Sequence, residues 1–131
     1  MAKGTRGTRG SEAIEFAIIL PALLMFVVGL MDTGRLLWVN GTLAHAVAAA
    51  ARCAAINATT CGTSTAVQAY AVQQAWPLGL ASSAFTVTAP ACGSQVAGTL
   101  SFSFLIPWSY VAAPFGVTNA MTLNAVACYP G

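Results

Sequence analysis

One apolar segment near the N-terminus constrains this chain more than any other feature. Residues 13–31 contain a single ionisable side chain, Glu15, and otherwise read as an unbroken run of apolar residues. At about 1.5 Å of rise per residue, a helix over this run nearly matches the roughly 30 Å apolar core of a bilayer. The run therefore predicts one membrane-spanning helix. The 131 residues leave room for one small domain beside it.

The flanking residues predict the orientation of this helix. Lys3, Arg6 and Arg9 lie in a leader, residues 1–10, that has no acidic side chain. Basic residues stay on the cytoplasmic side, so we expect the N-terminus inside and the C-terminal part exported from the inner (cytoplasmic) membrane. The small residue Gly10 precedes the apolar run instead of following it, which favours an anchor over an ordinary secretory signal.

The part expected to be exported carries very few charged side chains. Charged residues make up 6% of the chain, against about 25% in an average soluble domain, and the last of them is Arg52. A solvated monomer normally carries mixed surface charge. The composition favours a subunit that packs against copies of itself or other partners, the alternative being a neutral, Ser/Thr-rich secreted domain. A net charge of +2 gives no indication of nucleic-acid binding.

Periodicity predicts that the helix continues beyond the membrane. Apolar residues recur there at three- and four-residue steps, at Leu36, Val39, Leu43, Val47, Ala50 and Ala54. We expect one N-terminal helix, roughly Glu12 to Ile56, within the segment 11–57. A turn over residues 59–62 should follow it, and then a short second helix over residues 65–76 that ends before Pro77.

The remaining sequence changes to the period of strands. Segments 85–89, 95–106 and 121–129 place apolar side chains at alternate positions. Three short strands are marginal alone, so the outer half of the long helix should cover the sheet. The predicted class is α+β: a long N-terminal transmembrane helix, then a small exported domain, residues 58–131, with a short second helix and a three-stranded antiparallel sheet. The loop 107–119 carries aromatic residues that form either a contact patch or a cap on the sheet: Trp108, Tyr110 and Phe115.

All four cysteines lie in the part expected to be exported. An oxidising compartment allows an even set to form disulfides, and four cysteines have three possible pairings. We favour Cys53–Cys61, at the end of the long helix, and Cys92–Cys128, between a strand entrance and the C-terminus; free thiols are the alternative. There is no Cys-x-x-Cys and His45 is the single histidine, so we expect no metal and no cofactor.

Catalysis has little support in the sequence. The three carboxylates, Glu12, Glu15 and Asp32, all lie at or before the end of the apolar run. Serines and threonines are plentiful after Cys53, but no base follows Arg52 to activate one of them. No Gly-rich loop follows a strand to hold phosphate. We therefore expect that the protein is not an enzyme.

Several short motifs at the N-terminus occur in one characteristic order. They are Gly10-Ser11, Glu15-Phe16, Pro21 within the apolar run, Asp32-x-Gly34-Arg35 beyond it, and the alanine-rich segment 48–52. In this combination residues 10–56 resemble the N-terminal region of TadE-like proteins, the minor pilins or pseudopilins of tight-adherence (Flp-type) type IV pilus systems. The resemblance covers about a third of the chain.

The resemblance implies processing and assembly. A prepilin peptidase would cut between Gly10 and Ser11, and the processed subunit would join other pilin or pseudopilin subunits in a pilus, its tip or its assembly complex. As part of a pilus the processed subunit would be extracellular, and the pilus would serve cell adhesion. From the residues alone, the alternative is an uncleaved, single-pass, membrane-anchored binding domain that recognises a ligand through its aromatic loop.

The charged residues at the two ends of the apolar run each have two interpretations. A carboxylate at the mouth of an apolar helix is costly in lipid, and Glu15 can neutralise the new α-amino group of Ser11 on a neighbouring subunit. Alternatively, Glu15 only complements the helix dipole, worth about 0.3–1 kcal/mol. Asp32 and Arg35, three residues apart, can pair on the helix surface and mark the juxtamembrane boundary, or they contact a partner.

Overall fold

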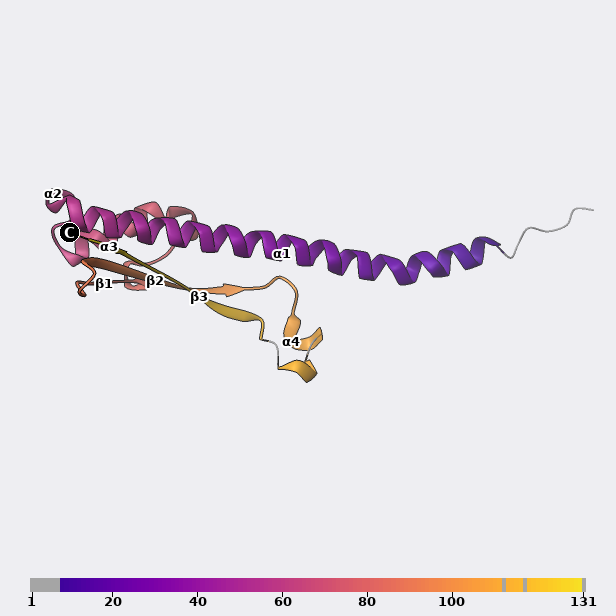
Figure 1. Ribbon diagram of the computed structural model, residues 1–131. Coiled ribbons are helices and arrows are strands. Elements are labelled where there is room, and N and C mark those ends of the chain that lie inside the picture. The colour runs from indigo at the N-terminus through magenta and orange to yellow at the C-terminus, as the bar shows by residue number, and fades with distance from the viewer. Residues whose placement is uncertain (1–7, 112, 117, 131) are drawn as a thin grey trace, which may run out of the picture.

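A computed structural model describes residues 8–111, 113–116 and 118–130 of the chain. Its dominant element is α1 (Thr8–Ile56), 49 residues that remain helical through Pro21. The other elements gather beside the C-terminal half of α1, and the N-terminal half projects away from them (Figure 1). They are α2 (Ala58–Cys61), α3 (Ser64–Gln74), the 3-10 helices η1 (Trp76–Leu78) and η2 (Ser82–Ala84), β1 (Phe85–Thr88), β2 (Ser94–Ser103), α4 (Trp108–Val111), η3 (Ala113–Phe115) and β3 (Ala120–Tyr129).

The three strands form one antiparallel sheet in the order β1-β2-β3, which confirms the expected α+β class. Phe85 of β1 lies opposite Gly98 of β2, and Leu100 of β2 lies opposite Leu123 of β3. The strand expected over residues 95–106 is shorter than predicted and ends at Ser103. Beyond that point the backbone N–H groups of Leu105 and Ile106 donate to the carboxylate of Asp32 instead of to a neighbouring strand.

Polar side chains set the boundaries of the two short helices after α1. The Asn57 side chain accepts a hydrogen bond from the Thr60 N–H at 3.1 Å and begins α2. The Thr63 hydroxyl accepts one from the Ala66 N–H at 3.2 Å and begins α3. The second helix therefore starts at Ser64 with Thr63 as its cap, one residue before the predicted start. It ends at Gln74, and Pro77 falls in η1.

The core lies between the C-terminal half of α1, α3 and one face of the sheet. Alanines dominate the contribution of α1, and its longest fully buried side chains are Leu43 and Val47. Gly98 of β2 faces this pair: a Cβ built on Gly98 would lie 2.9 Å from Val47 Cγ2 and 3.0 Å from Leu43 Cδ1. Glycine at this position is what allows the helix to lie so close to the sheet.

Two disulfides close the distal end of the domain. Cys53 pairs with Cys61, which joins the last turns of α1 to α2 across a Cα–Cα distance of 5.8 Å. Cys92 pairs with Cys128, which joins the β1–β2 turn to the end of β3 across 6.3 Å. These are the two pairs favoured from the sequence.

Candidate assembly site

The apolar half of α1 makes no tertiary contacts that would bury it. Every residue from 12 to 27 is exposed, including large side chains such as Phe16 and Phe26. Within the described residues one helix, α1, is sufficiently long and apolar to cross a membrane. So large an apolar surface is stable only when lipid or other apolar helices cover it. The arrangement fits a single-pass membrane protein.

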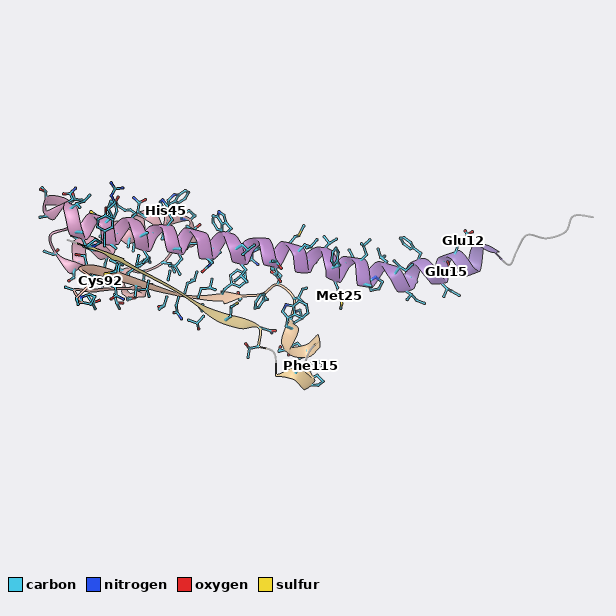
Figure 2. All side chains as sticks on the ribbon, viewed as in Figure 1. Glu12, Glu15, Met25, His45, Cys92 and Phe115 are labelled. Atoms are coloured by element: carbon cyan, nitrogen blue, oxygen red, sulfur yellow. A yellow bond between two sulfur atoms is a disulfide. The ribbon has the colours of Figure 1, made fainter. Side chains whose placement is uncertain are left out.

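The residues expected to direct processing and assembly lie at the free end of this half. Figure 2 shows Glu12 and Glu15 near the start of α1, far from the folded domain. Gly10, Glu15 and Phe16 are all exposed, and Ser11 lies in the first turns of the helix. Of the leader expected over residues 1–10, only residues 8–10 are among the described residues, as the first turn of α1. The structure thus places Gly10, Glu15 and Phe16 on one accessible helix end.

Asp32 marks the other end of the apolar run, and its carboxylate is buried, with 2% of the residue exposed. Oδ1 accepts from the Leu105 N–H at 3.1 Å, and Oδ2 accepts from the N–H groups of Leu105 and Ile106 at 3.0 and 3.3 Å. The expected pair with Arg35 is present, with Nη1 3.3 Å from Oδ1. We expected both residues of this pair on the helix surface, but only Arg35 lies there. Asp32 is buried because β2 ends at Ser103 and the N–H groups that follow it point to the Asp32 carboxylate.

Arg35 connects this carboxylate to the sheet. Its guanidinium carbon lies 5.4 Å from the centroid of the Phe102 ring, and Phe102 packs edge-on against Phe104 at 5.3 Å. A guanidinium over an aromatic face is attracted by the electrons of the ring. Sequence reasoning missed these contacts because the partners lie some seventy residues apart. The available signal was an aspartate directly after an apolar run, which does not identify its partner.

The aromatic loop after β2 extends away from the sheet. Tyr110 and Phe115 are 85% and 83% exposed, so these two rings do not cap the sheet. Trp108 is partly buried. Asn119 holds the two sides of the loop together: its side chain accepts from the Ser109 N–H at 2.8 Å, and its carbonyl accepts from the Phe104 N–H at 2.9 Å. Of the two interpretations offered by the sequence, the exposed rings support the contact patch.

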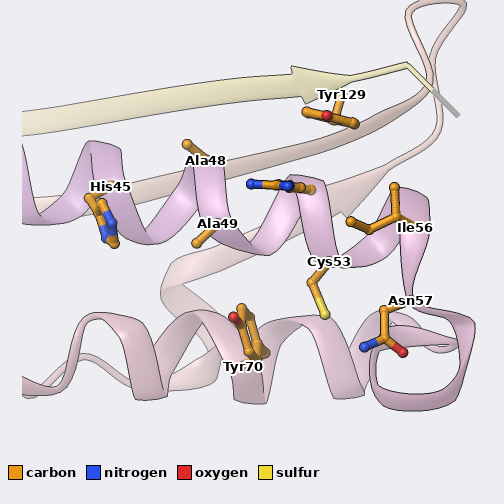
Figure 3. A pocket seen from close by; sticks show the side chains of 9 residues that line it. His45, Ala48, Ala49, Cys53, Ile56, Asn57, Tyr70 and Tyr129 are labelled. Carbon is orange, nitrogen blue, oxygen red and sulfur yellow. The ribbon is translucent and has the colours of Figure 1, made fainter.

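An open groove of about 540 Å³ lies at the distal end of the domain, between α1, α3 and the end of β3 (Figure 3). Its walls include alanines of α1, the rings of Tyr70 and Tyr129, and the basic or titratable side chains of His45 and Arg52. Among the described residues that line it there is no carboxylate. Within the described residues no three His, Cys, Asp or Glu side chains come together in a way that could hold a metal ion. The described walls of the groove therefore offer an apolar and aromatic surface for contact.

One half of the long helix is apolar and uncovered, and a small disulfide-closed domain packs on the other half. These features define the class: an α+β protein with one candidate membrane anchor in its described residues. Residues 10–52 match the model of the family described as TadE-like protein. This match, over about a third of the chain, confirms the resemblance to TadE-like proteins. That family is a structural one associated with tight-adherence pili, not a known enzyme family. Neither the curated proteins nor the solved structures give a match.

Proposed function

We propose that this chain is a pilin-like structural subunit of a tight-adherence pilus or of its assembly complex, cleaved after Gly10 and assembled through the apolar half of α1. The observation that supports this most is the bare stretch of α1 over residues 12–27, which lies inside the TadE-like segment and carries Glu15 at its mouth. A bare helix of this length requires a partner, and in an assembly the partner is the same helix of neighbouring subunits.

The proposed subunit has three parts with different roles. The leader, residues 1–10, holds the N-terminus in the cytoplasm until a prepilin peptidase removes it. The helix segment 11–57 anchors the chain in the inner membrane through residues 13–31, and the domain 58–131 lies outside, where its disulfides form. Moving the apolar half from lipid into a helix bundle keeps its side chains in apolar surroundings, so the transfer costs little hydrophobic free energy.

Glu15 gives the assembly its register. Cleavage creates a positively charged amine on Ser11, four residues before the carboxylate. In a dry helix bundle the attraction between the amine of one subunit and Glu15 of its neighbour offsets part of the cost of burying both charges. A subunit docked at another height would leave both groups buried without a partner, which is strongly unfavourable. The pair therefore favours one axial position between neighbours.

Glu15→Ala tests this role, with Glu12→Ala as the matched control because both glutamates are exposed near the same helix end. We expect both variants to be cleaved normally, since the cut lies before either residue. Glu15→Ala should be lost from sheared pili or from the isolated assembly complex, whereas Glu12→Ala should be retained. Intact mass reports cleavage, and immunoblotting of the assembled fraction reports incorporation. Equal incorporation of the two variants would reduce Glu15 to a helix-end charge.

A second candidate function is an uncleaved, membrane-anchored binding domain. The exposed rings of Tyr110 and Phe115 and the distal groove are the observations that favour it. The intact mass of the protein isolated from its native membrane separates the two functions. A mature chain that starts at Ser11 supports the pilin-like subunit, and a chain that still starts at Met1 supports the anchored binding domain.

A further inference from the structure

We infer that the loop after β2 is a second membrane contact, in which exposed aromatic and aliphatic side chains enter the interface between lipid headgroups and acyl chains on the side of the membrane that carries the domain. We call residues 105–110 and 113–116 the docking loop. The inference rests on the proposed membrane placement of α1 and adds to it a lipid-binding surface on the exported domain.

The position of the docking loop is set by Asp32. This residue is the first ionisable side chain after the apolar run 13–31, so it lies where the helix leaves the apolar core of the bilayer. Its buried carboxylate binds the N–H groups of Leu105 and Ile106 at 3.0–3.3 Å. The docking loop therefore begins at the depth of the membrane boundary, and a short, rigid connection holds it there.

From this point the chain extends past the end of the sheet, in the direction in which the apolar half of α1 projects (Figure 1). Figure 1 shows α4 and η3 beyond the sheet, on the side of the projecting helix. Figure 2 places Phe115 level with the part of α1 next to Met25, which is inside the apolar run. When α1 crosses a bilayer, the tip of the docking loop consequently reaches the lipid surface before any other part of the domain.

The side chains of the docking loop suit the membrane interface. Leu105, Tyr110 and Phe115 are 60%, 85% and 83% exposed. Aromatic rings are enriched at the level of the lipid headgroups, where a tyrosine keeps its hydroxyl in water while its ring is in contact with lipid. The chain has no charged residue after Arg52, so entry of the docking loop does not strip water from a charge.

Several backbone N–H groups of the docking loop already have hydrogen-bond partners within the chain, as a less polar environment requires. A backbone N–H or C=O group without a hydrogen-bond partner costs several kcal/mol in the apolar core of a bilayer. In the docking loop the N–H of Ser109 donates to the Asn119 side chain, that of Tyr110 donates to the Pro107 carbonyl, and that of Gly116 donates to the Ala113 carbonyl. These amides are satisfied within the chain before any contact with lipid.

Lipid is favoured over a second copy of the chain because the surface is continuous with the anchor. Leu30 and Met31, at the end of the apolar run, are 58% and 60% exposed at the level where the docking loop begins. The height at which the docking loop begins is therefore determined by the protein's own helix, through the bonds of Asp32 to Leu105 and Ile106. A contact with a second copy would not require this match between the height of the loop and the end of the anchor.

Quenching of tryptophan fluorescence by brominated lipid tests the inference in the full-length protein. Trp38→Phe with Trp76→Phe leaves Trp108 of the docking loop as the single tryptophan. Two companion proteins carry all three Trp→Phe changes and one new reporter each: Leu24→Trp inside the apolar run, and Tyr129→Trp beside the distal groove. All three are reconstituted in phosphatidylcholine vesicles with and without bromine on the acyl chains.

We expect lipid to quench Trp108 at least about twofold more than the Tyr129→Trp reporter, with the Leu24→Trp reporter quenched most. If Leu24→Trp is quenched but Trp108 behaves like Tyr129→Trp, the inference is wrong while the membrane placement of α1 stands. If Leu24→Trp is also unquenched, the membrane placement in the proposed function fails. A blue shift of Trp108 that grows with protein density, without bromine quenching, assigns the loop to a second copy and overturns the lipid contact.

Substitution within the docking loop gives a second reading. Tyr110→Ser with Phe115→Ser should lower the quenching of Trp108 towards the level of the Tyr129→Trp reporter. Val126→Ser is the matched control, because Val126 is an apolar residue of β3 that is 60% exposed but lies outside the docking loop. An equal effect of both changes would contradict a specific lipid contact by the docking loop.

Discussion

Asp32 is the residue on which the arrangement of the anchor and the domain depends. Its carboxylate joins α1 to a segment 73 residues later in the chain and is 2% exposed. A buried carboxylate is tolerated when hydrogen bonds and an opposite charge compensate the loss of water. Here two backbone amides and Arg35 supply both. Bonds of this kind are stronger than those between neutral groups, because the acceptor carries a full charge.

Asp32→Asn should therefore loosen the loop after β2. The substitution removes the charge and replaces one acceptor oxygen by an NH₂ group that faces the N–H groups of Leu105 and Ile106. Hydrogen bonds to a charged group contribute about 1.5–3 kcal/mol, so we expect the free energy of unfolding to fall by about that amount. Hydrogen exchange of these two amides and denaturant unfolding in detergent measure the effect.

Glu12→Gln is the control for Asp32→Asn, because it makes the same chemical change at an exposed position of the same helix. It should leave the exchange rates of Leu105 and Ile106 unchanged. Unaltered protection of these amides in Asp32→Asn would show that the carboxylate does not hold the segment.

At the scale of elements, the packing of α1 on the sheet depends on small residues. The alanine-rich outer half of α1 and Gly98 of β2 bring the two layers together, with Leu43 and Val47 filling the space between them. The sequence was sufficient to predict this half of α1 and the three strands, because apolar periods of 3.6 and 2 are local properties. It was not sufficient to predict the end of β2, because the competing acceptor, Asp32, belongs to another element.

Gly98→Ala should destabilise the domain. The new Cβ would lie 2.9 Å from Val47 Cγ2, 3.0 Å from Leu43 Cδ1 and 3.1 Å from Phe85 Cε1, so helix or sheet must shift. Overpacking of a core costs about 1–3 kcal/mol. Gly41→Ala is the same substitution on the exposed side of α1, where a Cβ meets nothing within 4 Å.

We expect Gly41→Ala to raise the free energy of unfolding by up to about 1 kcal/mol, because alanine replaces glycine in a helix interior. Denaturant unfolding of both variants under identical conditions provides the comparison. Stabilisation by both changes would show that the helix and sheet are less closely packed at Gly98 than the structure indicates.

At the scale of the whole molecule, the chain has two ends with opposite properties. The free half of α1 exposes its apolar side chains, whereas the distal end is closed by both disulfides and carries the groove (Figure 1). Stability is therefore concentrated in the domain, and the requirement for a partner is concentrated in the helix. This division suits a subunit whose domain must stay folded while its anchor moves from lipid into an assembly.

The two disulfides should contribute unequally to stability. Cys92–Cys128 spans 36 residues and Cys53–Cys61 spans 8. Chain entropy then predicts a loss of about 4 kcal/mol for Cys92→Ser with Cys128→Ser, and of about 2.5 kcal/mol for Cys53→Ser with Cys61→Ser. Thermal unfolding of the two double variants without reductant tests the order, and a larger loss from the short loop would contradict it.

The sequence by itself determined the long apolar N-terminal helix, the α+β class, the alternating strands and the TadE-like motifs. Each of these is written in hydropathy, period or spacing within one stretch of the chain. Only the tertiary structure decided that Asp32 is buried, that Arg35 lies over Phe102 and that the aromatic loop begins beside Asp32, at the end of the apolar run. Those features depend on which distant groups meet when the sheet packs on α1, and local patterns carry no information about such meetings.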